Sequence, residues 1–158
     1  MRKLFQRDRK SRSGTAIIEF AIGSGILMAV FGGTFEFGYT FYIYNNLETA
    51  VNNGAKYAAL RVYEQTTNTP SACFTSAVQD MVAYADPTGT TTTPVAPGLA
   101  PGNVSVTATF NNSVPSQVTV GLSSYTIDSV FARITLTNKP QITYPFLGRY
   151  APGETCSQ

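Results

Sequence analysis

Histidine and tryptophan are missing from this chain of 158 residues, and cysteine occurs only twice. Without histidine, Ser-His-Asp and Cys-His catalytic arrangements and His-ligated metal sites are excluded. Two cysteines are too few for a disulfide-dense scaffold or a four-thiolate zinc site. Charged residues make up only 13% of the chain, whereas a typical soluble domain has about 25%. We find no Gly-rich phosphate loop and no activated serine, so we expect no enzyme activity, no cofactor and no metal.

The few charges are unevenly distributed. Residues 1–14 contain six basic residues and one acidic residue, a net charge of +5, whereas residues 15–158 have a net charge of −3. Because the body of the chain is acidic, the overall net charge of +2 does not indicate a nucleic-acid-binding protein. We therefore expect no nucleic-acid partner, and the basic segment needs another explanation.

A long apolar stretch follows the basic segment. Residues 15–47 carry only two charges, Glu19 and Glu36, and a bilayer core needs about 20 mostly apolar residues in a helix. Apolar or small residues then continue at helical spacing, at Leu47, Val51, Gly54, Ala55, Ala58 and Val62. The pattern predicts one helix from about residue 15 to about residue 64. Basic residues before it predict a cytoplasmic N-terminus and an exported body.

Two features of the apolar stretch allow sharper hypotheses. Glu19 is a functional candidate, because an ionisable side chain inside lipid costs about 2.5 kcal/mol or more; the alternative is a boundary carboxylate that reaches the headgroups. Small residues recur every four positions along one stripe, at Ala21, Gly25, Ala29 and Gly33. Such a stripe favours close packing between helices in a bilayer, although glycine is common in membrane helices in general.

The start of this stretch resembles the cleavage site of type IV prepilins and pseudopilins. Residues 12–14, Arg-Ser-Gly, end a short basic leader, and Glu19 is the fifth residue of a chain that begins at Thr15. The resemblance implies that a prepilin peptidase cuts between Gly14 and Thr15. It also implies that Glu19 and the adjacent Phe20 serve subunit assembly, with Glu19 pairing with the N-terminal amine of a neighbouring subunit. An amine and a carboxylate in low dielectric are less costly together than apart.

The following residues are similar to the N-terminal module of the TadE-like family. They are F-G-G-T-F-E-F-G at 31–38, an aromatic and asparagine patch at 42–47, and G-A-K-Y-A-A at 54–59. Lys56 stands where that family usually has arginine, and Phe20 where tyrosine often follows the glutamate. The resemblance covers about residues 14–60. It implies a pseudopilin of the tight-adherence (Flp-type) pilus and secretion machinery. The implied partners are other pilin and pseudopilin subunits, the prepilin peptidase, an inner-membrane assembly platform and the lipid bilayer.

Glu36 lies about 25 Å along the helix from Glu19, at the rise of an α-helix, near the outer boundary of the membrane. Two interpretations stay open. It is either an interfacial carboxylate or a subunit-assembly residue that pairs with Lys56 or Arg61 of a staggered neighbouring subunit.

The remainder predicts a small exported domain. Ser71 is placed to cap a second helix that ends near Ala85, and residues 86–102 are rich in Pro, Gly and Thr and read as a surface loop. Alternating apolar residues predict strands at 104–110 and 130–137, with shorter pieces at 117–120 and 142–146. The expected fold is α+β: a long N-terminal transmembrane, pilin-like helix as a spine, a second short helix and a small antiparallel β-sheet head, covered by one of the helices. The expected division is a leader at 1–14, the helix at 15–64 and the exported head at 65–158.

Cys73 and Cys156 both fall in the predicted exported part, where disulfides form and persist. We therefore predict a Cys73–Cys156 disulfide that ties the second helix to the C-terminal tail. The alternative is two independent thiols.

Two functional hypotheses follow from these observations. The first is a pseudopilin, anchored once in the inner membrane with its head in the periplasm, or outside the cell when built into a pilus for adhesion. The second is an uncleaved membrane-tethered module whose head binds a partner. A cryptic hydrolase is a distant third, because no catalytic arrangement supports it.

Overall fold

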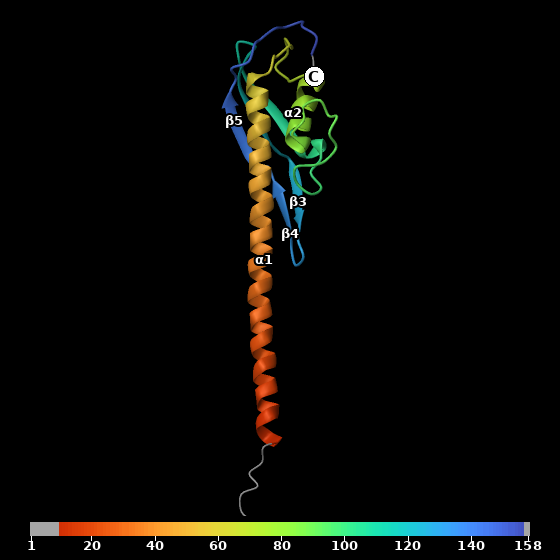
Figure 1. Ribbon diagram of the computed structural model, residues 1–158. Coiled ribbons are helices and arrows are strands. Elements are labelled where there is room, and N and C mark those ends of the chain that lie inside the picture. Colours follow the sequence, from red (N-terminus) through yellow and green to blue (C-terminus); the bar gives the residue numbers. More distant parts are fainter. Residues whose placement is uncertain (1–9, 157–158) are drawn as a thin grey trace, which may run out of the picture. The chain divides into compact units, whose positions relative to one another are not determined.

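The computed structural model describes residues 10–156, with side chains from residue 14 onward. Helix α1 (Lys10–Leu60) is the longest element, and it runs through two compact units that divide between Tyr39 and Thr40 (Figure 1). Among the described residues, the first unit consists of the N-terminal part of α1, and the second contains the rest of α1 and every other element. Most of the segment predicted as a leader, residues 1–14, lies outside the described residues.

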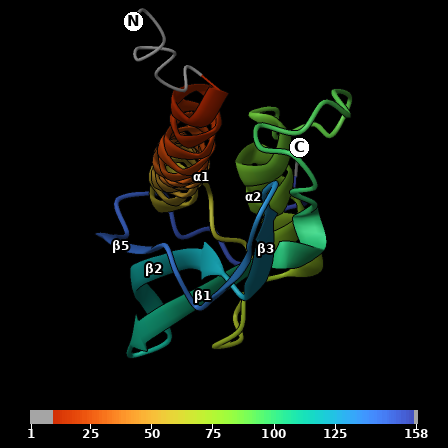
Figure 2. The same ribbon diagram turned by 90° about the horizontal axis from the view of Figure 1, so that it is seen from below.

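The second unit has the predicted α+β fold. Helix α2 (Ala72–Tyr84) and the short 3-10 helix η1 (Pro101–Asn103) precede strands β1 (Val104–Asn111), β2 (Val114–Leu122), β3 (Ser124–Asp128), β4 (Arg133–Thr137) and β5 (Gln141–Pro145). Strands β1, β2 and β5 form one antiparallel sheet in that order, and β3 and β4 form a separate hairpin. In Figure 2, the part of α1 that belongs to this unit and α2 lie on the same side of the three-stranded sheet.

Helix α1 ends at Leu60, about four residues before the predicted end. The chain leaves the helix because Tyr63 pairs with the C-terminal segment in a parallel bridge to Tyr150. The Tyr63 N–H donates to the Arg149 carbonyl at 2.9 Å, and the Tyr63 carbonyl accepts from the Ala151 N–H at 2.9 Å. Helical periodicity alone does not reveal this pairing, because its partner lies more than eighty residues away.

Helix α2 begins and ends where local residues dictate. The Ser71 hydroxyl accepts a hydrogen bond from the Phe74 N–H at 2.9 Å, as predicted for an N-cap. Ala85 ends the helix in the left-handed conformation, and its N–H donates to the Met81 carbonyl at 3.1 Å. The helix buries Phe74, Ala77, Val78, Val82 and Ala83.

The core is formed by one stripe of α1 together with α2 and β2. From Ile43 onward the apolar side chains of this stripe are buried, at Ile43, Leu47, Ala50, Val51, Ala55, Ala58 and Ala59. Strand β2 adds Val118, Val120 and Leu122. Burial of such side chains contributes roughly 1.5–3 kcal/mol each for the larger ones, so this stripe holds the second unit together.

Two strands differ from the sequence-based expectation. The strand predicted at 130–137 begins only at Arg133, because residues 129–132 form a turn in which the Ser129 N–H donates to the Ala132 carbonyl at 3.0 Å. Strand β3 is not predicted, although it alternates correctly, with Tyr125 and Ile127 buried. The single expected sheet is therefore two, since the chain bends at Ser123, whose N–H donates to the Asn103 carbonyl at 2.8 Å.

Cys73 and Cys156 form a disulfide, with their Cα atoms 6.3 Å apart. The bond joins the first turn of α2 to the end of the described chain. The same C-terminal segment is held along residues 59–64 by backbone hydrogen bonds, including Leu147 N–H to Ala59 (2.8 Å) and Gly153 N–H to Glu64 (3.0 Å). The tail is thus fastened both covalently and by its backbone.

Tyr63 lies at the centre of an aromatic cluster and is fully buried. Its ring meets Phe74 and Phe110 edge-on, with both centroid distances 5.6 Å, and it stacks with Tyr150 at 6.4 Å. Its hydroxyl donates to the Thr67 carbonyl at 3.1 Å. Burial, followed by the charges of Glu64 and Tyr150, raises the pKa of Tyr63 to about 12.

This raised pKa predicts a specific alkaline instability. Below pH 10 the phenol is neutral in both the folded and the unfolded state, and its contribution to stability is fully present. Between about pH 10 and 12 the unfolded state ionises first, so the free energy of unfolding falls by up to roughly 3 kcal/mol. We expect Tyr63→Phe to remove this component while costing about 1 kcal/mol near neutrality for the lost hydrogen bond.

The measurement is denaturant unfolding of both proteins at a series of alkaline pH values. Tyr144→Phe is the matched control, because Tyr144 also donates one hydrogen bond, to the Asn52 side chain at 2.8 Å, and it should retain the alkaline loss. Parallel pH profiles for the wild-type protein and Tyr63→Phe would contradict the assignment.

Candidate functional site

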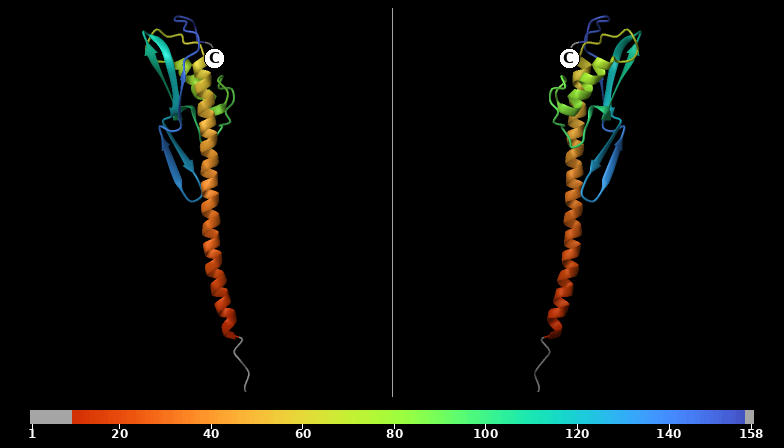
Figure 3. Two further views of the ribbon diagram at one scale, coloured as in Figure 1. Left: turned by 90° about the vertical axis from the view of Figure 1, so that its left-hand side faces the viewer. Right: turned by 90° about the vertical axis from the view of Figure 1, so that its right-hand side faces the viewer.

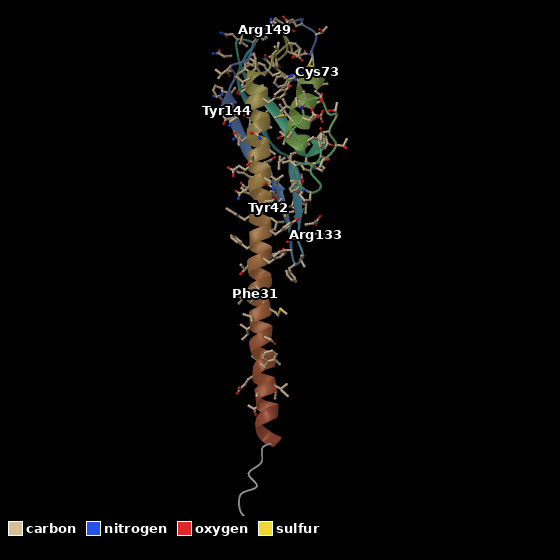
Figure 4. All side chains as sticks on the ribbon, in the orientation of Figure 1. Phe31, Tyr42, Cys73, Arg133, Tyr144 and Arg149 are labelled. Atoms are coloured by element: carbon tan, nitrogen blue, oxygen red, sulfur yellow. A yellow bond between two sulfur atoms is a disulfide. The ribbon has the colours of Figure 1, made fainter. Side chains whose placement is uncertain are left out.

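The N-terminal part of α1 presents apolar side chains to its surroundings in every direction. The large apolar residues between Ile17 and Phe37 have exposed fractions from 56% to 77%. They are Ile17, Ile18, Phe20, Ile22, Ile26, Leu27, Met28, Val30, Phe31, Phe35 and Phe37. Figure 4 shows Phe31 projecting from the helix surface. A water-exposed helix of this composition would be strongly unfavourable.

This helix is long and apolar enough to cross a membrane. The candidate span lies within Gly14–Leu60, with a mean hydropathy of 1.8, and none of its most apolar window is buried. A core helix of a soluble protein would be mostly buried, so that alternative does not fit. The single apolar helix in the described residues suggests a single-pass membrane anchor.

The polar side chains within the apolar segment include hydroxyls that bond to the helix itself. The Ser24 hydroxyl donates to the Ala21 carbonyl at 3.0 Å, and the Thr34 hydroxyl donates to the Val30 carbonyl at 2.9 Å. In lipid no water is available to satisfy such groups, so an internal partner is required. These two residues are therefore compatible with a lipid environment.

Glu19 and Phe20 are both exposed on the first turns after Gly14. Glu19 is surrounded in sequence by apolar residues, including Ile18, whose side chain is 62% exposed. A carboxylate placed among lipid-facing side chains is costly unless a cation meets it. The geometry therefore leaves Glu19 accessible to a neighbouring molecule, as its predicted role requires.

The stripe of small residues is open along its length. Ala21, Gly25, Ala29 and Gly33 are all exposed. At Gly25 and at Gly33, no atom lies within 4 Å of the place that a Cβ would occupy. The surface above these two glycines is thus smooth and accessible to a second helix.

The residues considered as partners of Glu36 differ in accessibility. Arg61 is engaged within its own chain: its guanidinium lies over the Tyr57 ring at 5.5 Å from the centroid and 3.2 Å from Cys156 Sγ. Lys56 is exposed, and Glu36 is half-buried. Of the two predicted cations, Lys56 is therefore the more accessible.

The predicted processing site lies inside α1 rather than before it. The helix begins at Lys10, and Gly14 and Thr15 are exposed within it. No atom lies within 4 Å of a Cβ built on Gly14. A side chain at this position would therefore meet no other part of the described chain.

The G-A-K-Y-A-A sequence at 54–59 has a packing role that the sequence alone does not reveal. Gly54 is buried where α1 crosses α2, and a Cβ there would lie 2.2 Å from Val82 Cγ2. Ala55 and Ala58 are completely buried on the same side of α1. Small residues at these positions let α2 approach the α1 backbone.

A polar groove lies between α1 and β5. It is lined by Asn45, Glu48, Thr49, Asn52, Ile142 and Tyr144 and has a volume of about 510 Å³. The Tyr144 hydroxyl, on β5, donates to the Asn52 side chain on α1. The groove belongs entirely to the second unit, and its lining offers hydrogen-bonding side chains to a small polar ligand.

Sequence reasoning missed two features of the head. Tyr63 follows the G-A-K-Y-A-A sequence, and nothing in the helical period marks it as the centre of the core. Strand β3 was not predicted, so its pairing with β4 in a hairpin was missed as well; the alternation of Tyr125 with Ile127 was the available signal.

We predict that Gly54→Ala destabilises the second unit. Val82 is β-branched and fully buried, so it cannot easily turn away from a new methyl group. The overpacking should cost about 1–3 kcal/mol, partly offset by the better helix propensity of alanine, about 1 kcal/mol. Gly102→Ala is the control, since nothing lies within 4 Å of that position.

Thermal unfolding of the purified protein measures the effect. Combining Gly54→Ala with Val82→Ala should recover part of the loss, because the second change removes the clashing methyl groups. Strictly additive losses in the double variant would argue against the contact.

Comparison with known proteins bears on α1 alone. No curated protein matches this chain, and no solved structure does. Among protein families, the model described as TadE-like protein matches residues 14–56. The match begins at Gly14 and includes the exposed apolar segment, Glu19, Glu36 and Gly54, which confirms the resemblance recognised in the sequence. Residues 14–56, just over a quarter of the chain, are thus similar to TadE-like proteins, and the remaining elements of the α+β head lie outside the match.

Proposed function

We propose that this protein is a pilin-like (pseudopilin) subunit of a tight-adherence, type IV pilus or secretion assembly. The observation that carries the proposal is that the family match and the exposed apolar surface of α1 begin at nearly the same residue. The TadE-like match begins at Gly14, and the continuous exposed apolar surface begins only three residues later at Ile17. A segment that starts at a processing motif and then offers an uncovered apolar helix has the properties of an assembly element.

In this proposal the helix spans the inner membrane once. Basic residues before the span favour retention of that end in the cytoplasm. The head then faces the periplasm, or the cell exterior when the subunit is part of a pilus. The Cys73–Cys156 disulfide is consistent with an oxidising location.

Subunit contacts are assigned to three features of the helix. The new amine at Thr15 of one subunit pairs with Glu19 of its neighbour, because each charge reduces the cost of placing the other in low dielectric. The open glycines of the small-residue stripe allow another helix to approach closely. Glu36 meets the exposed Lys56 of a staggered subunit.

An uncleaved membrane-tethered binding module is the second candidate. The groove between α1 and β5 favours it, because its lining is mainly polar and includes the Glu48 carboxylate. Such a protein would keep residues 1–14 and would use the helix only as an anchor. The two candidates therefore differ at the N-terminus.

N-terminal sequencing of the protein from membranes of cells with an active prepilin peptidase tests the proposal. We expect the mature chain to start at Thr15 and, having lost the basic segment, to focus at an acidic isoelectric point. Gly14→Leu should leave the precursor uncut. A wild-type chain that retains Met1 under these conditions would favour the tether.

The assembly role of Glu19 gives a second prediction. Glu19→Ala should still be cleaved but should enter the assembly about a hundredfold less well or worse, because loss of one partner of a low-dielectric pair costs roughly 3–5 kcal/mol. Quantifying the variant in sheared filaments or in crosslinked complexes measures this. Glu48→Ala, which removes an exposed carboxylate on the part of α1 in the head, is the control. Normal incorporation of Glu19→Ala would remove the pairing role.

A further inference from the structure

The head carries a concentrated apolar surface at the tip of the β3–β4 hairpin. Val130 and Phe131, in the turn between β3 and β4, are each 71% exposed. In contrast, Tyr125 and Ile127 on β3 are buried, so the hairpin is anchored through β3 while the turn that follows it keeps a large exposed apolar area. Single exposed apolar residues are ordinary on a protein surface, but two neighbouring ones at a hairpin turn form a candidate interaction site.

The direction in which the hairpin runs shows which end of the head its tip occupies. Within the second unit, β3 runs beside α1 toward the Thr40 end, and the chain turns back into β4 there (Figure 3). Figure 4 places Arg133, the first residue of β4, close to the level of Tyr42 on α1. Thr40 is also where the chain enters this unit from the apolar anchor. The tip therefore lies at the end of the head to which the membrane span is attached.

The side chains at this level are those of a membrane–water interface. Phe41 and Tyr42 on α1 are 57% and 61% exposed, and aromatic rings of this kind favour the headgroup region. Directly behind the apolar tip, Arg133 and Asp128 form an ion pair at 2.7 Å whose side chains are 82% and 66% exposed. The order along the hairpin is thus apolar at the tip and charged behind it.

We propose that the tip of the β3–β4 hairpin inserts into the outer surface of the lipid bilayer. Val130 and Phe131 enter the boundary between headgroups and acyl chains, and Arg133 lies at the level of the lipid phosphates, whose negative charge attracts a nearby cation. The hairpin then acts as a second contact with the membrane and restrains how the head tilts about the anchor. This inference requires only that α1 spans the membrane, and it holds for either candidate function.

The absence of tryptophan from the chain provides a clean probe. Phe131→Trp introduces a single indole at the tip. Leu147→Trp is the matched control, because Leu147 is equally exposed at 72% and lies at the other end of the head. Its N–H bonds to the Ala59 carbonyl, and Ala59 is about 25 Å along α1 from Tyr42 at the rise of a helix.

Both full-length variants are reconstituted into vesicles of phosphatidylethanolamine and phosphatidylglycerol, with and without brominated acyl chains. We expect Phe131→Trp to emit at shorter wavelength than Leu147→Trp, because the indole at the tip lies at the interface. For the same reason, brominated lipid should quench the fluorescence of Phe131→Trp at least about twice as strongly as that of Leu147→Trp. The two variants carry the same indole, so its intrinsic preference for interfaces does not account for a difference between them. Adding Val130→Asp to Phe131→Trp should return quenching to the level of Leu147→Trp, since a carboxylate opposes insertion.

Flotation of the vesicles after alkaline carbonate extraction first establishes that α1 is inserted, which separates a failure of the anchor from a failure of the hairpin contact. With the anchor inserted, equal quenching of the two single variants would overturn the proposal. Blue-shifted emission from Phe131→Trp that brominated lipid does not quench would also overturn it, because the tip would then be covered by protein, such as a second copy of the chain.

Discussion

The rest of this structure depends on one constraint: the helix α1 has to be stable with one part exposed and apolar and the other part packed into the head. Up to Phe37, the large apolar side chains of α1 are exposed, whereas from Ile43 onward the apolar stripe facing α2 and the sheet is buried. The head can form only if the second part stays helical and straight enough for Gly54 to meet Val82. The first part is stable only where lipid or other helices cover it.

The head is closed at the far end of α1 by interactions that join distant parts of the chain. Tyr63 leaves the helix, fills the centre of the aromatic cluster and pairs through its backbone with the C-terminal segment. The disulfide fastens the same segment to α2. These contacts compensate for the small size of the head, because a domain of this size buries a limited core and gains from covalent closure.

The proposed contacts with other molecules lie away from the end of the head that Tyr63 and the disulfide close. Assembly contacts lie on the exposed part of α1, where Glu19 and the open glycines face outward. The hairpin tip, with Val130 and Phe131, lies at the end of the head where α1 enters it. The opposite end, with Tyr63 and the disulfide, carries the internal closure of the head. The proposed contacts with other molecules and the contacts that close the head therefore lie at different positions along α1.

The sequence by itself determined α1, the cap of α2 at Ser71, the alternation of β1 and the TadE-like segment, because each depends on spacing or capping within a few residues. It also favoured the Cys73–Cys156 disulfide that the structure contains, but it misplaced the start of β4 and contained no sign of the Tyr63 cluster. Only the tertiary structure decided these features. They include the turn at 129–132, the contact of Gly54 with Val82 and the bridge from Tyr63 to Tyr150. Each depends on how side chains and backbone groups share space in the folded protein, and the local spacing of residues does not encode this.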